Sequence, residues 1–334
     1  MGTARHLIDL EGSVRLGFHV CAVAGAALLL AACAPAEIPP HLRPLSRETV
    51  MLLGKKSMRT DQPIFIRIFK EESELEVWKQ RDDGRFYHVK TYPICNWSGE
   101  LGPKIREGDR QAPEGFYKVA RQQMNPNSRY HLAFNLGYPN VYDKTQGRTG
   151  EFVMVHGKCK SAGCYAMTDE LMEEIYALSR EAFIGGQDII EVHAYPFRMT
   201  DENLARYQQS EHYAFWSTLK QAYDYFELTR RPPAVAVCEK RYIVNVKWRG
   251  SPPSRIDPDQ VCPAYDQPNP DPFKPAGHMK VAEERVTAPG AKKRALAVST
   301  QGGMLSGLTN GGLGKSSGFN TGSTFGVGLA SAIR

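Results

Sequence analysis

The sequence predicts an α+β fold that is mostly β, contains a few helices and ends in a disordered tail. Short segments that are typical of strands recur between residues 62 and 195, with glycine, proline and asparagine between them, and the first of these segments alternates with a period of two. Apolar residues repeat at helical spacing only after residue 168. From Gln301 to Ala330 the chain is rich in glycine, serine and threonine, and it offers little that could form a core.

The first expected strand begins at Gln62, where isoleucines alternate with Phe65, Arg67 and Phe69 as in a strand with one buried face. The next two, at 74–80 and 85–92, flank the turn signal Asp82-Asp83-Gly84 and should form a hairpin. Further strands are expected at 116–121, 130–135, 151–155, 188–195 and 234–246.

A helix is expected after Thr168, which is a suitable N-cap followed by two acidic residues. Its apolar residues recur at helical spacing until Gly185-Gly186. Cys164 therefore lies just ahead of a helix N-terminus, where a thiolate would be stabilised. Two more helices are expected at 202–209 and 212–228, and we interpret the aromatic residues of the second as core packing.

The N-terminus resembles a bacterial lipoprotein signal. Arg15 precedes an apolar run, Leu16 to Leu30, that leads into Ala31-Ala32-Cys33. The run is shorter than the roughly 20 residues needed to span a bilayer, which favours a removed signal. We expect lipidation at Cys33, with a plain secretory signal cleaved nearby as the alternative. Ala34 after the cysteine favours an outer-membrane anchor facing the periplasm.

These patterns divide the chain into five parts. We expect a signal at 1–33, a proline-rich linker at 34–60 and a catalytic domain at 61–200. A helical and strand extension at 201–263 should pack on that domain, and 264–334 should be a disordered basic tail. From Ala276 onward the tail carries a balance of +5 out of the whole chain's +6. We interpret the tail as a solvated extension, with contact to anionic wall polymers or lipid as the alternative, and we expect no nucleic-acid partner.

Cysteine usage indicates one free thiol. Cys21 leaves with the signal and Cys33 carries lipid, so an odd number remains: Cys95, Cys159, Cys164, Cys238 and Cys262. Oxidising surroundings permit disulfides, and Cys238 with Cys262 is a plausible pair, although spacing cannot fix the connectivity. The pattern does not indicate structural zinc.

The segment from Val155 to Thr168 places a histidine, a serine and a cysteine within ten residues. A thiol attacks carbonyls only as thiolate, so it needs a proton acceptor and backbone N–H groups for the oxyanion. His156 could accept the proton of Cys164 if the loop brings the two side chains within hydrogen-bond reach. The alternative is a packed histidine beside a buried structural cysteine. Cys159 could be a redox partner of Cys164 or, as we favour, a small loop residue.

The string VMVHGKCKSAGCYAMTD resembles the active-site signature of the YkuD-type L,D-transpeptidase catalytic domain, specifically its YafK-like branch. The resemblance extends over residues 62–246. Supporting stretches are found at 112–117, 135–140, 147–150 and 192–199. It implies a β-rich catalytic domain in which Cys164 is the nucleophile, His156 the base, and the Gly163 and Cys164 N–H groups the oxyanion hole. Ser161 would set the loop or polarise the site.

The chain departs from the broader family at two positions. Most members have a histidine where this chain has Ala162, and an arginine shortly after the cysteine where it has Ala166-Met167. Recognition of a substrate carboxylate must therefore come from elsewhere, and Arg148 is the candidate. Three other residues could line the substrate groove or orient the base: Tyr138, Asn140 and His193.

The resemblance implies cysteine-dependent transpeptidation of peptidoglycan stem peptides at meso-diaminopimelate, through a thioester, in cell wall organisation. The same first step followed by water would hydrolyse a stem peptide, or the amide joining an envelope lipoprotein to diaminopimelate. A different class is a catalytically idle scaffold that binds the cell wall. The resemblance implies no metal and no organic cofactor.

Overall fold

The computed structural model describes residues 37–250, 256–274 and 284–286. The expected signal at 1–33, its lipidation site Cys33 and most of the tail lie outside the described residues. Within the described ranges, no helix has both the length and the apolar character that crossing a membrane requires.

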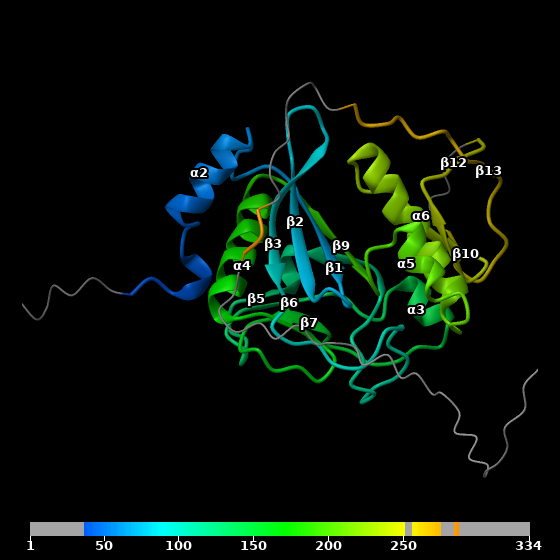
Figure 1. Cartoon of the computed structure of the whole chain (residues 1–334), viewed down its shortest axis with the longest axis horizontal. Helices are drawn as coiled ribbons and strands as arrows, with labels where there is room; N and C mark the ends of the chain where they lie inside the picture. Colours follow the sequence, from blue (N-terminus) through cyan, green and yellow to red (C-terminus); the bar gives the residue numbers. More distant parts are fainter. Residues whose placement is uncertain (1–36, 251–255, 275–283, 287–334) are drawn as a thin grey trace, which may run out of the picture. The chain divides into compact units, whose positions relative to one another are not determined.

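Hydrophobic core residues pack on both faces of a five-stranded sheet. Its strands β1, β2, β3 and β9 are labelled in Figure 1. Its strand order is β3-β2-β1-β9-β4, with β1 and β9 parallel and the other neighbours antiparallel. The strands are β1 (Ile64–Phe69), β2 (Glu74–Gln80), β3 (Phe86–Pro93), β4 (Gly115–Ala120) and β9 (Ile189–Tyr195). All five were expected from the sequence, β1 from its alternating pattern, and β2 and β3 form the hairpin that the turn signal predicted.

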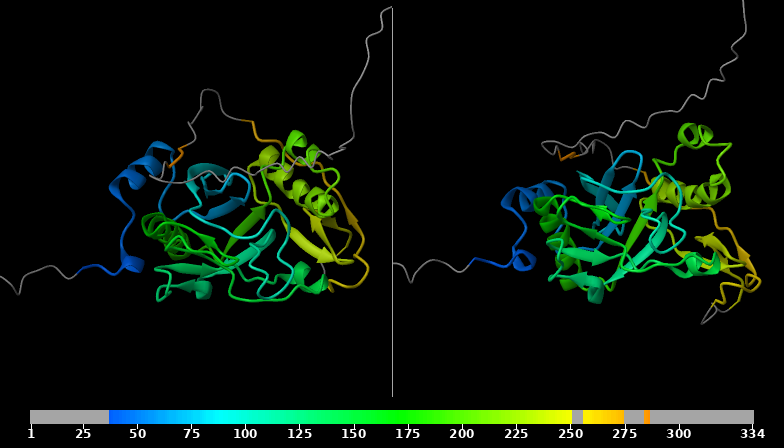
Figure 2. Two further views of the ribbon diagram at one scale, coloured as in Figure 1. Left: turned by 60° about the horizontal axis from the view of Figure 1, so that its bottom comes forward. Right: turned by 90° about the horizontal axis from the view of Figure 1, so that it is seen from below.

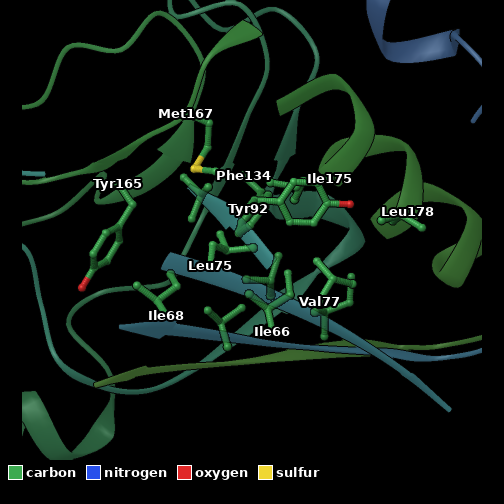
Figure 3. Close-up of a cluster of buried hydrophobic side chains, with 14 of the residues drawn as sticks. Ile66, Ile68, Leu75, Val77, Tyr92, Phe134, Tyr165, Met167, Ile175 and Leu178 are labelled. Atoms are coloured by element: carbon green, nitrogen blue, oxygen red, sulfur yellow. The ribbon is translucent and has the colours of Figure 1, made fainter. Parts of the chain in front are cut away.

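Both faces of β1 are buried, so the expectation of one exposed face is wrong. Ile66 and Ile68 pack on one side with Ile175 and Leu178 of α4 (Asp169–Ile184), as Figure 3 shows. On the other side, Phe69 packs with aromatic residues of α6 (Tyr213–Thr229). A strand between two helical layers has no solvent face.

Arg67 belongs to the buried face of β1 that meets α6, and its side chain is only 2% exposed. Its guanidinium pairs with Glu76 at 2.7 Å and Glu227 at 2.6 Å. A charge can be buried when such partners replace water, and alternating sequence alone does not reveal them.

A second, four-stranded sheet has the order β5-β6-β7-β8. Its strands are β5 (Met124–Asn125), β6 (Ala133–Asn135), β7 (Met154–His156) and β8 (Tyr165–Ala166), with β7 and β8 parallel. Phe134 and Tyr165 point into the core that also contains Ile66 and residues of α4 (Figure 3), and Val155 belongs to the same core. The opposite, outer face of β7 and β8 is therefore left for other contacts.

Helix α4 begins as predicted. The Thr168 side chain accepts a hydrogen bond from Leu171 N, which satisfies one free donor of the first turn. The helix ends at Gly185, where a Cβ atom would lie 1.8 Å from the Asp61 carbonyl oxygen. Only glycine allows the chain to pass so close to its neighbour.

The expected linker at 34–60 contains two helices, so it is not an extended tether throughout. Residues Pro40–Leu42 form a 3-10 helix (η1) and Arg47–Lys55 form α2, which lies beside α4 in Figures 1 and 2. Leu53 is 1% exposed in the main core, and Thr49 donates a 2.6 Å hydrogen bond to Glu174 of α4. These two residues are four positions apart, so they lie on the same face of α2. The prolines that precede α2 favoured a linker over a helix in the sequence-based prediction.

The C-terminal region contains α5 (Asp201–Ala205), α6 and a hairpin of β10 (Val235–Cys238) and β11 (Arg241–Val244). A single strand was expected at 234–246, but Glu239 and Lys240 have φ angles of 50° and 55° and reverse the chain. Two successive residues with positive φ are typical of tight hairpin turns. Cys238 forms a disulfide with Cys262, as the sequence suggested.

Part of the expected disordered tail is ordered. Tyr265–Asp266 forms β13 and pairs with β12 (Lys247–Trp248), and residues 284–286 pair with Thr91 of β3. The remaining short elements are η2 (Arg121–Gln123) and α3 (Val141–Thr145). The rest of the tail beyond 286 lies outside the described residues.

The packing of α2 predicts a difference between two residues of the same helix. Leu53→Ala should destabilise the protein by about 2–5 kcal/mol, because it removes buried methyl groups from the core. Met51→Ala is the control, because Met51 is 58% exposed. Urea unfolding measures both, and equal midpoints would contradict the packed helix.

Candidate active site

The two short parallel strands β7 and β8 bring His156 and Cys164 into one neighbourhood. Val155 pairs with Tyr165 and His156 with Ala166, so the register places Cys164 next to Met154. Because Val155 and Tyr165 point into the core, the alternate residues lie on the outer face. The strand pairing, rather than a folded-back loop, therefore brings the two sequence-predicted residues together.

The Cys164 thiol is half-buried and contacts the chain just before and within β7. Met154 N–H lies 3.4 Å from Sγ, and Sγ lies 3.8 Å from the Phe152 carbonyl oxygen. Burial raises the pKa of the thiol, while the Met154 N–H and the positive charge of Lys104 act in the opposite direction. The thiol form is therefore favoured in this structure.

The expected support of a thiolate by the α4 N-terminus is not found. Strand β8 separates Cys164 from the helix, and the first residue of α4 serves the loop instead. Asp169 Oδ1 accepts a 2.7 Å hydrogen bond from Lys158 N. The carboxylate at the helix start thus holds the loop rather than the nucleophile.

His156 is 3% exposed and has a fixed tautomer. Its Nδ1 lies 2.6 Å from the Gly157 carbonyl oxygen, which can only accept, so Nδ1 carries the proton and Nε2 is left as a proton acceptor. Burial lowers the pKa of the imidazole, which keeps it neutral, and the ring of Tyr130 packs at 4.7 Å. Its hydrogen bond with the thiol, which the sequence led us to expect, is not formed in the described part of the chain.

Ser161 shapes the turn that leads into Cys164. Its hydroxyl donates to the Cys164 carbonyl oxygen at 2.7 Å and accepts from Gly163 N at 3.2 Å. Gly163 has φ 125°, and a Cβ there would also approach the Gln111 carbonyl oxygen to 3.4 Å. The structure thus gives Ser161 a positioning contact and explains the glycine.

This turn changes the expected oxyanion hole. The Gly163 N–H is already bonded to Ser161, whereas the Cys164 N–H has no hydrogen-bond partner among the described residues. The Cys164 N–H is therefore the donor that remains available to a ligand, and the Gly163 N–H becomes available only if the Ser161 contact opens.

Cys159 is joined to Cys95 by a disulfide with a Cα–Cα distance of 5.3 Å. The interpretation of Cys159 as a small loop residue is wrong, and so is its pairing with Cys164. Cys159 N also donates to the Met167 carbonyl oxygen at 3.0 Å, so the loop between His156 and Cys164 is fixed at its middle. Among the described cysteines, Cys164 is the free one, as the odd count predicted.

The segment from Ser98 to Glu114, called the wall segment below, lies beside the loop between His156 and Cys164. A buried ion pair holds this segment in place. Lys70 and Glu114 are both fully buried with a 2.9 Å contact, and Lys70 also donates to the carbonyl oxygens of Gly102 and Ala112. Glu114 accepts from Gly102 N and from Trp216 Nε1, each at 2.7 Å. At the far end of the wall segment, Ser98 Oγ lies 3.3 Å from Ser161 Oγ.

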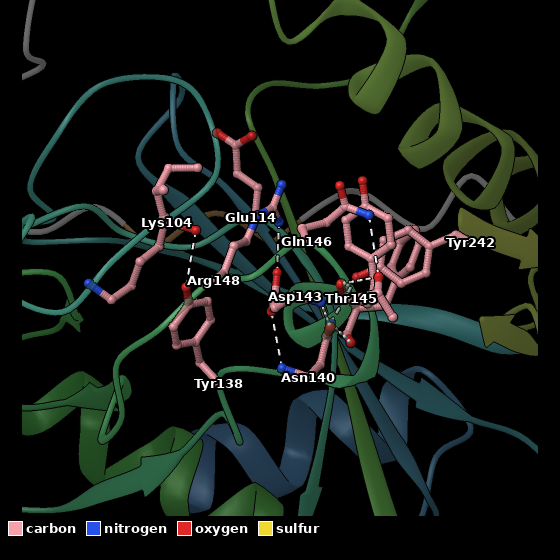
Figure 4. A network of polar contacts seen from close by, with 12 residues as sticks. Lys104, Glu114, Tyr138, Asn140, Asp143, Thr145, Gln146, Arg148 and Tyr242 are labelled. Carbon is pink, nitrogen blue, oxygen red and sulfur yellow. Dashed lines mark hydrogen bonds and ion pairs between the residues drawn. The ribbon is translucent and has the colours of Figure 1, made fainter. Parts of the chain in front are cut away.

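Arg148 does not present a free guanidinium to a substrate. It is 8% exposed and pairs with Asp143 at 2.7 Å (Figure 4). Its Cζ atom also lies 5.2 Å and 5.0 Å from the ring centroids of Tyr142 and Phe215, which stack on each other. The proposed carboxylate-binding role is therefore wrong for this structure. Phe215 lies on the distant helix α6, so the sequence around Arg148 gave no sign of this enclosure.

Tyr138 and Asn140 both make structural hydrogen bonds (Figure 4), and Asn140 also lines a cavity to which neither Cys164 nor His156 contributes. Tyr138 is 4% exposed, and its hydroxyl donates to the Lys104 carbonyl oxygen at 3.1 Å. Asn140 caps α3 and donates to the Tyr242 hydroxyl at 2.8 Å.

His193 lies on the face of β9 that packs toward α6, whereas β7 and β8 pack on the other side of the sheet. Its ring contacts Phe65 at 4.8 Å and Phe116 at 4.5 Å, and Nδ1 lies 3.2 Å from the Tyr195 hydroxyl. It therefore cannot orient His156.

The sequence did not identify Lys104 as part of the site. This lysine is 5% exposed, pairs with Asp109, and its charge acts on the Cys164 thiol. An isolated lysine in a loop carries no local signal, and only the fold of the wall segment brings it near. No cluster of three metal-ligating side chains occurs within the described ranges.

Comparison with known proteins defines the family. The sequence model of the YkuD family, described as the L,D-transpeptidase catalytic domain, matches residues 63–184. The Escherichia coli K12 protein named "Putative L,D-transpeptidase YafK" is 46% identical over 190 residues, covering 57% of this chain and 77% of that protein. The chain belongs to the L,D-transpeptidase family, and the resemblance to its YkuD domain and to YafK is confirmed.

Two solved structures are also similar. The helical cell shape determining protein Pgp2 of Campylobacter jejuni is 19% identical with a TM-score of 0.34, over 59% of this chain and 80% of that one. Bd1075 of Bdellovibrio bacteriovorus is 18% identical with a TM-score of 0.29, over 60% of this chain and 82% of that one.

The burial of the thiol predicts the pH dependence of its alkylation. Because burial raises the pKa of Cys164 above its ordinary value of 9.0, the reaction with iodoacetamide should still accelerate above that pH. Mass spectrometry of the Cys164 peptide at a series of pH values gives the rates. A plateau already reached near neutral pH would show a preformed thiolate–imidazolium pair and contradict this expectation.

The turn contacts predict that Ser161→Ala slows acylation of Cys164 by about tenfold or more, since the loop loses both hydroxyl contacts. The rate at which a carbapenem, a β-lactam that acylates nucleophiles, forms an adduct on Cys164 measures the effect. Ser98→Ala is the control, because Ser98 meets the turn only through Ser161. Equal rates in wild type and Ser161→Ala would remove Ser161 from the site.

Proposed function

We propose that this protein is a cysteine-dependent L,D-transpeptidase that acts on peptidoglycan stem peptides at meso-diaminopimelate. The single observation that carries the proposal is the free thiol of Cys164 directly before strand β8, which pairs with the strand that carries the buried, neutral His156. The loop between the two residues is held by the Cys95–Cys159 disulfide and by the hydrogen bond from Cys159 N to the Met167 carbonyl oxygen. A scaffold that only bound the wall would need neither a free thiol nor an imidazole with a fixed tautomer.

In the first half-reaction, His156 Nε2 takes the proton from Cys164 as Sγ attacks the carbonyl carbon at the L-centre of diaminopimelate. The raised thiol pKa and lowered imidazole pKa mean that this transfer accompanies attack rather than precedes it. The Cys164 N–H donates to the oxyanion. Collapse breaks the amide bond, His156 returns the proton to the departing D-alanine amine, and a thioester remains.

In the second half-reaction an acceptor amine attacks the thioester, forms the new amide and restores the thiol. Water in place of the amine gives a carboxylate, so the same residues would act as a peptidase or would release an envelope lipoprotein. The first half-reaction is common to both outcomes. We further propose that the reaction takes place in the periplasm, with the protein anchored to the outer membrane through Cys33.

Incubation with purified muropeptides, followed by mass spectrometry, tests the proposal. Wild type should yield a crosslinked dimer, and Cys164→Ala should yield none, because the nucleophile is lost. A shortened peptide in place of the dimer would show hydrolysis instead. The control is the double variant Cys238→Ala/Cys262→Ala, which removes the hairpin disulfide and should stay active. Full turnover in Cys164→Ala would assign the chemistry to another residue.

A further inference from the structure

A cavity of about 590 Å³ lies on the face of the first sheet that carries α6. It is lined by β4, β9, α3 with the residues before it, and the β10–β11 hairpin. Neither Cys164 nor His156 lines it, and its volume is in the range of small-molecule sites. The proposed reaction does not use this cavity.

Aromatic rings form a wall of the cavity. Tyr142 and Tyr242 stack with ring centroids 4.2 Å apart, and Phe116 packs against Tyr242 at 4.7 Å. Val235 and Val237 of the hairpin add aliphatic surface. Such walls suit the apolar part of a ligand rather than a fully hydrated ion.

Glu191 brings negative charge to the cavity. Its side chain is 29% exposed, and its shielded Oε2 atom lies 3.6 Å from His193 Nε2, a contact that is an ion pair only when His193 is protonated. Burial lowers the pKa of His193, so the neutral imidazole does not compensate the carboxylate charge. The exposed part of the carboxylate is therefore available to a ligand ammonium group.

Two lysines bring positive charge to the same cavity. Lys118 pairs with Glu191 in the β4–β9 register, so both side chains project from the same face of the sheet. Lys144 contributes from α3. Both lysines are exposed, and neither forms an ion pair within the described ranges. They are available to a carboxylate that lies beside the ammonium bound by Glu191.

We propose that this cavity binds an α-amino-acid zwitterion carried on a short aliphatic chain. A dicarboxylate would be repelled by Glu191, and a diamine by the lysines, whereas a zwitterion complements both. The choice of ligand rests on the proposed function, because the D-centre of diaminopimelate carries a free ammonium and carboxylate on such a chain. A second binding site for peptidoglycan peptides on the same protein would raise the concentration of these peptides near Cys164.

Calorimetric titration of the full-length protein tests the proposal with three matched probes. These are meso-diaminopimelate, pimelate, which lacks the amines, and cadaverine, which lacks the carboxylates. We expect saturable binding of meso-diaminopimelate, and binding at least tenfold weaker for the other two. Glu191→Gln and Lys118→Met should each weaken binding of meso-diaminopimelate at least tenfold. The control Lys55→Met, an exposed lysine at the end of α2, should leave it unchanged.

Absence of saturable binding, or binding unaffected by both Glu191→Gln and Lys118→Met, would overturn the proposal. Loss of binding after a carbapenem has acylated Cys164 would also overturn it, because that result would show that the ligand binds at Cys164 and not in this cavity. Thermal melting of each variant identifies any loss of fold, and Lys118 lies on an exposed edge where substitution is tolerated. Muropeptide turnover is measured in parallel. Turnover without binding refutes only this inference, and Glu191-dependent binding without turnover supports it while refuting the proposed function.

Discussion

The buried ion pair between Lys70 and Glu114 is the contact on which the site depends. It connects the end of β1, the wall segment at 98–114 and Trp216 of α6 through five hydrogen bonds. Burial lowers the pKa of Lys70, and the carboxylate of Glu114 opposes that shift. Removing one member of such a pair typically costs about 3–5 kcal/mol, because the other charge stays buried alone. The segment 98–114, which lies beside the turn that precedes Cys164, thus takes its position from the core.

Most of the fold could be predicted because its signals are local. The alternation in β1, the Thr168 cap and the Asp82-Asp83-Gly84 turn each lie within a few residues. The failures depend on distant partners. Arg67 marks a doubly covered strand only once Glu227 of α6 is in place. Likewise, α2 is stabilised by α4, which lies more than a hundred residues later.

The residues of the candidate site were also predictable where they lie close together in the sequence and unpredictable where their partners are distant. His156, Ser161, Gly163 and Cys164 lie on one short stretch, so their neighbourhood was evident from the sequence. The Cys95–Cys159 disulfide spans a separation of 64 residues, and the sequence allowed several pairings. Arg148 was misassigned because its partner Asp143 and the covering ring of Phe215 are defined only by the fold. A single arginine looks the same in the sequence whether it is enclosed or free.

The helices η1 and α2 limit how far the catalytic body can move from a lipid. A linker over all of 34–60 could extend about 90 Å, at roughly 3.3 Å per residue. Since η1 already begins at Pro40, six residues separate it from Cys33, and they span only about 20 Å. Under the proposed anchoring at Cys33, the enzyme would stay close to the bilayer. It could then reach only the peptidoglycan that lies nearest the outer membrane.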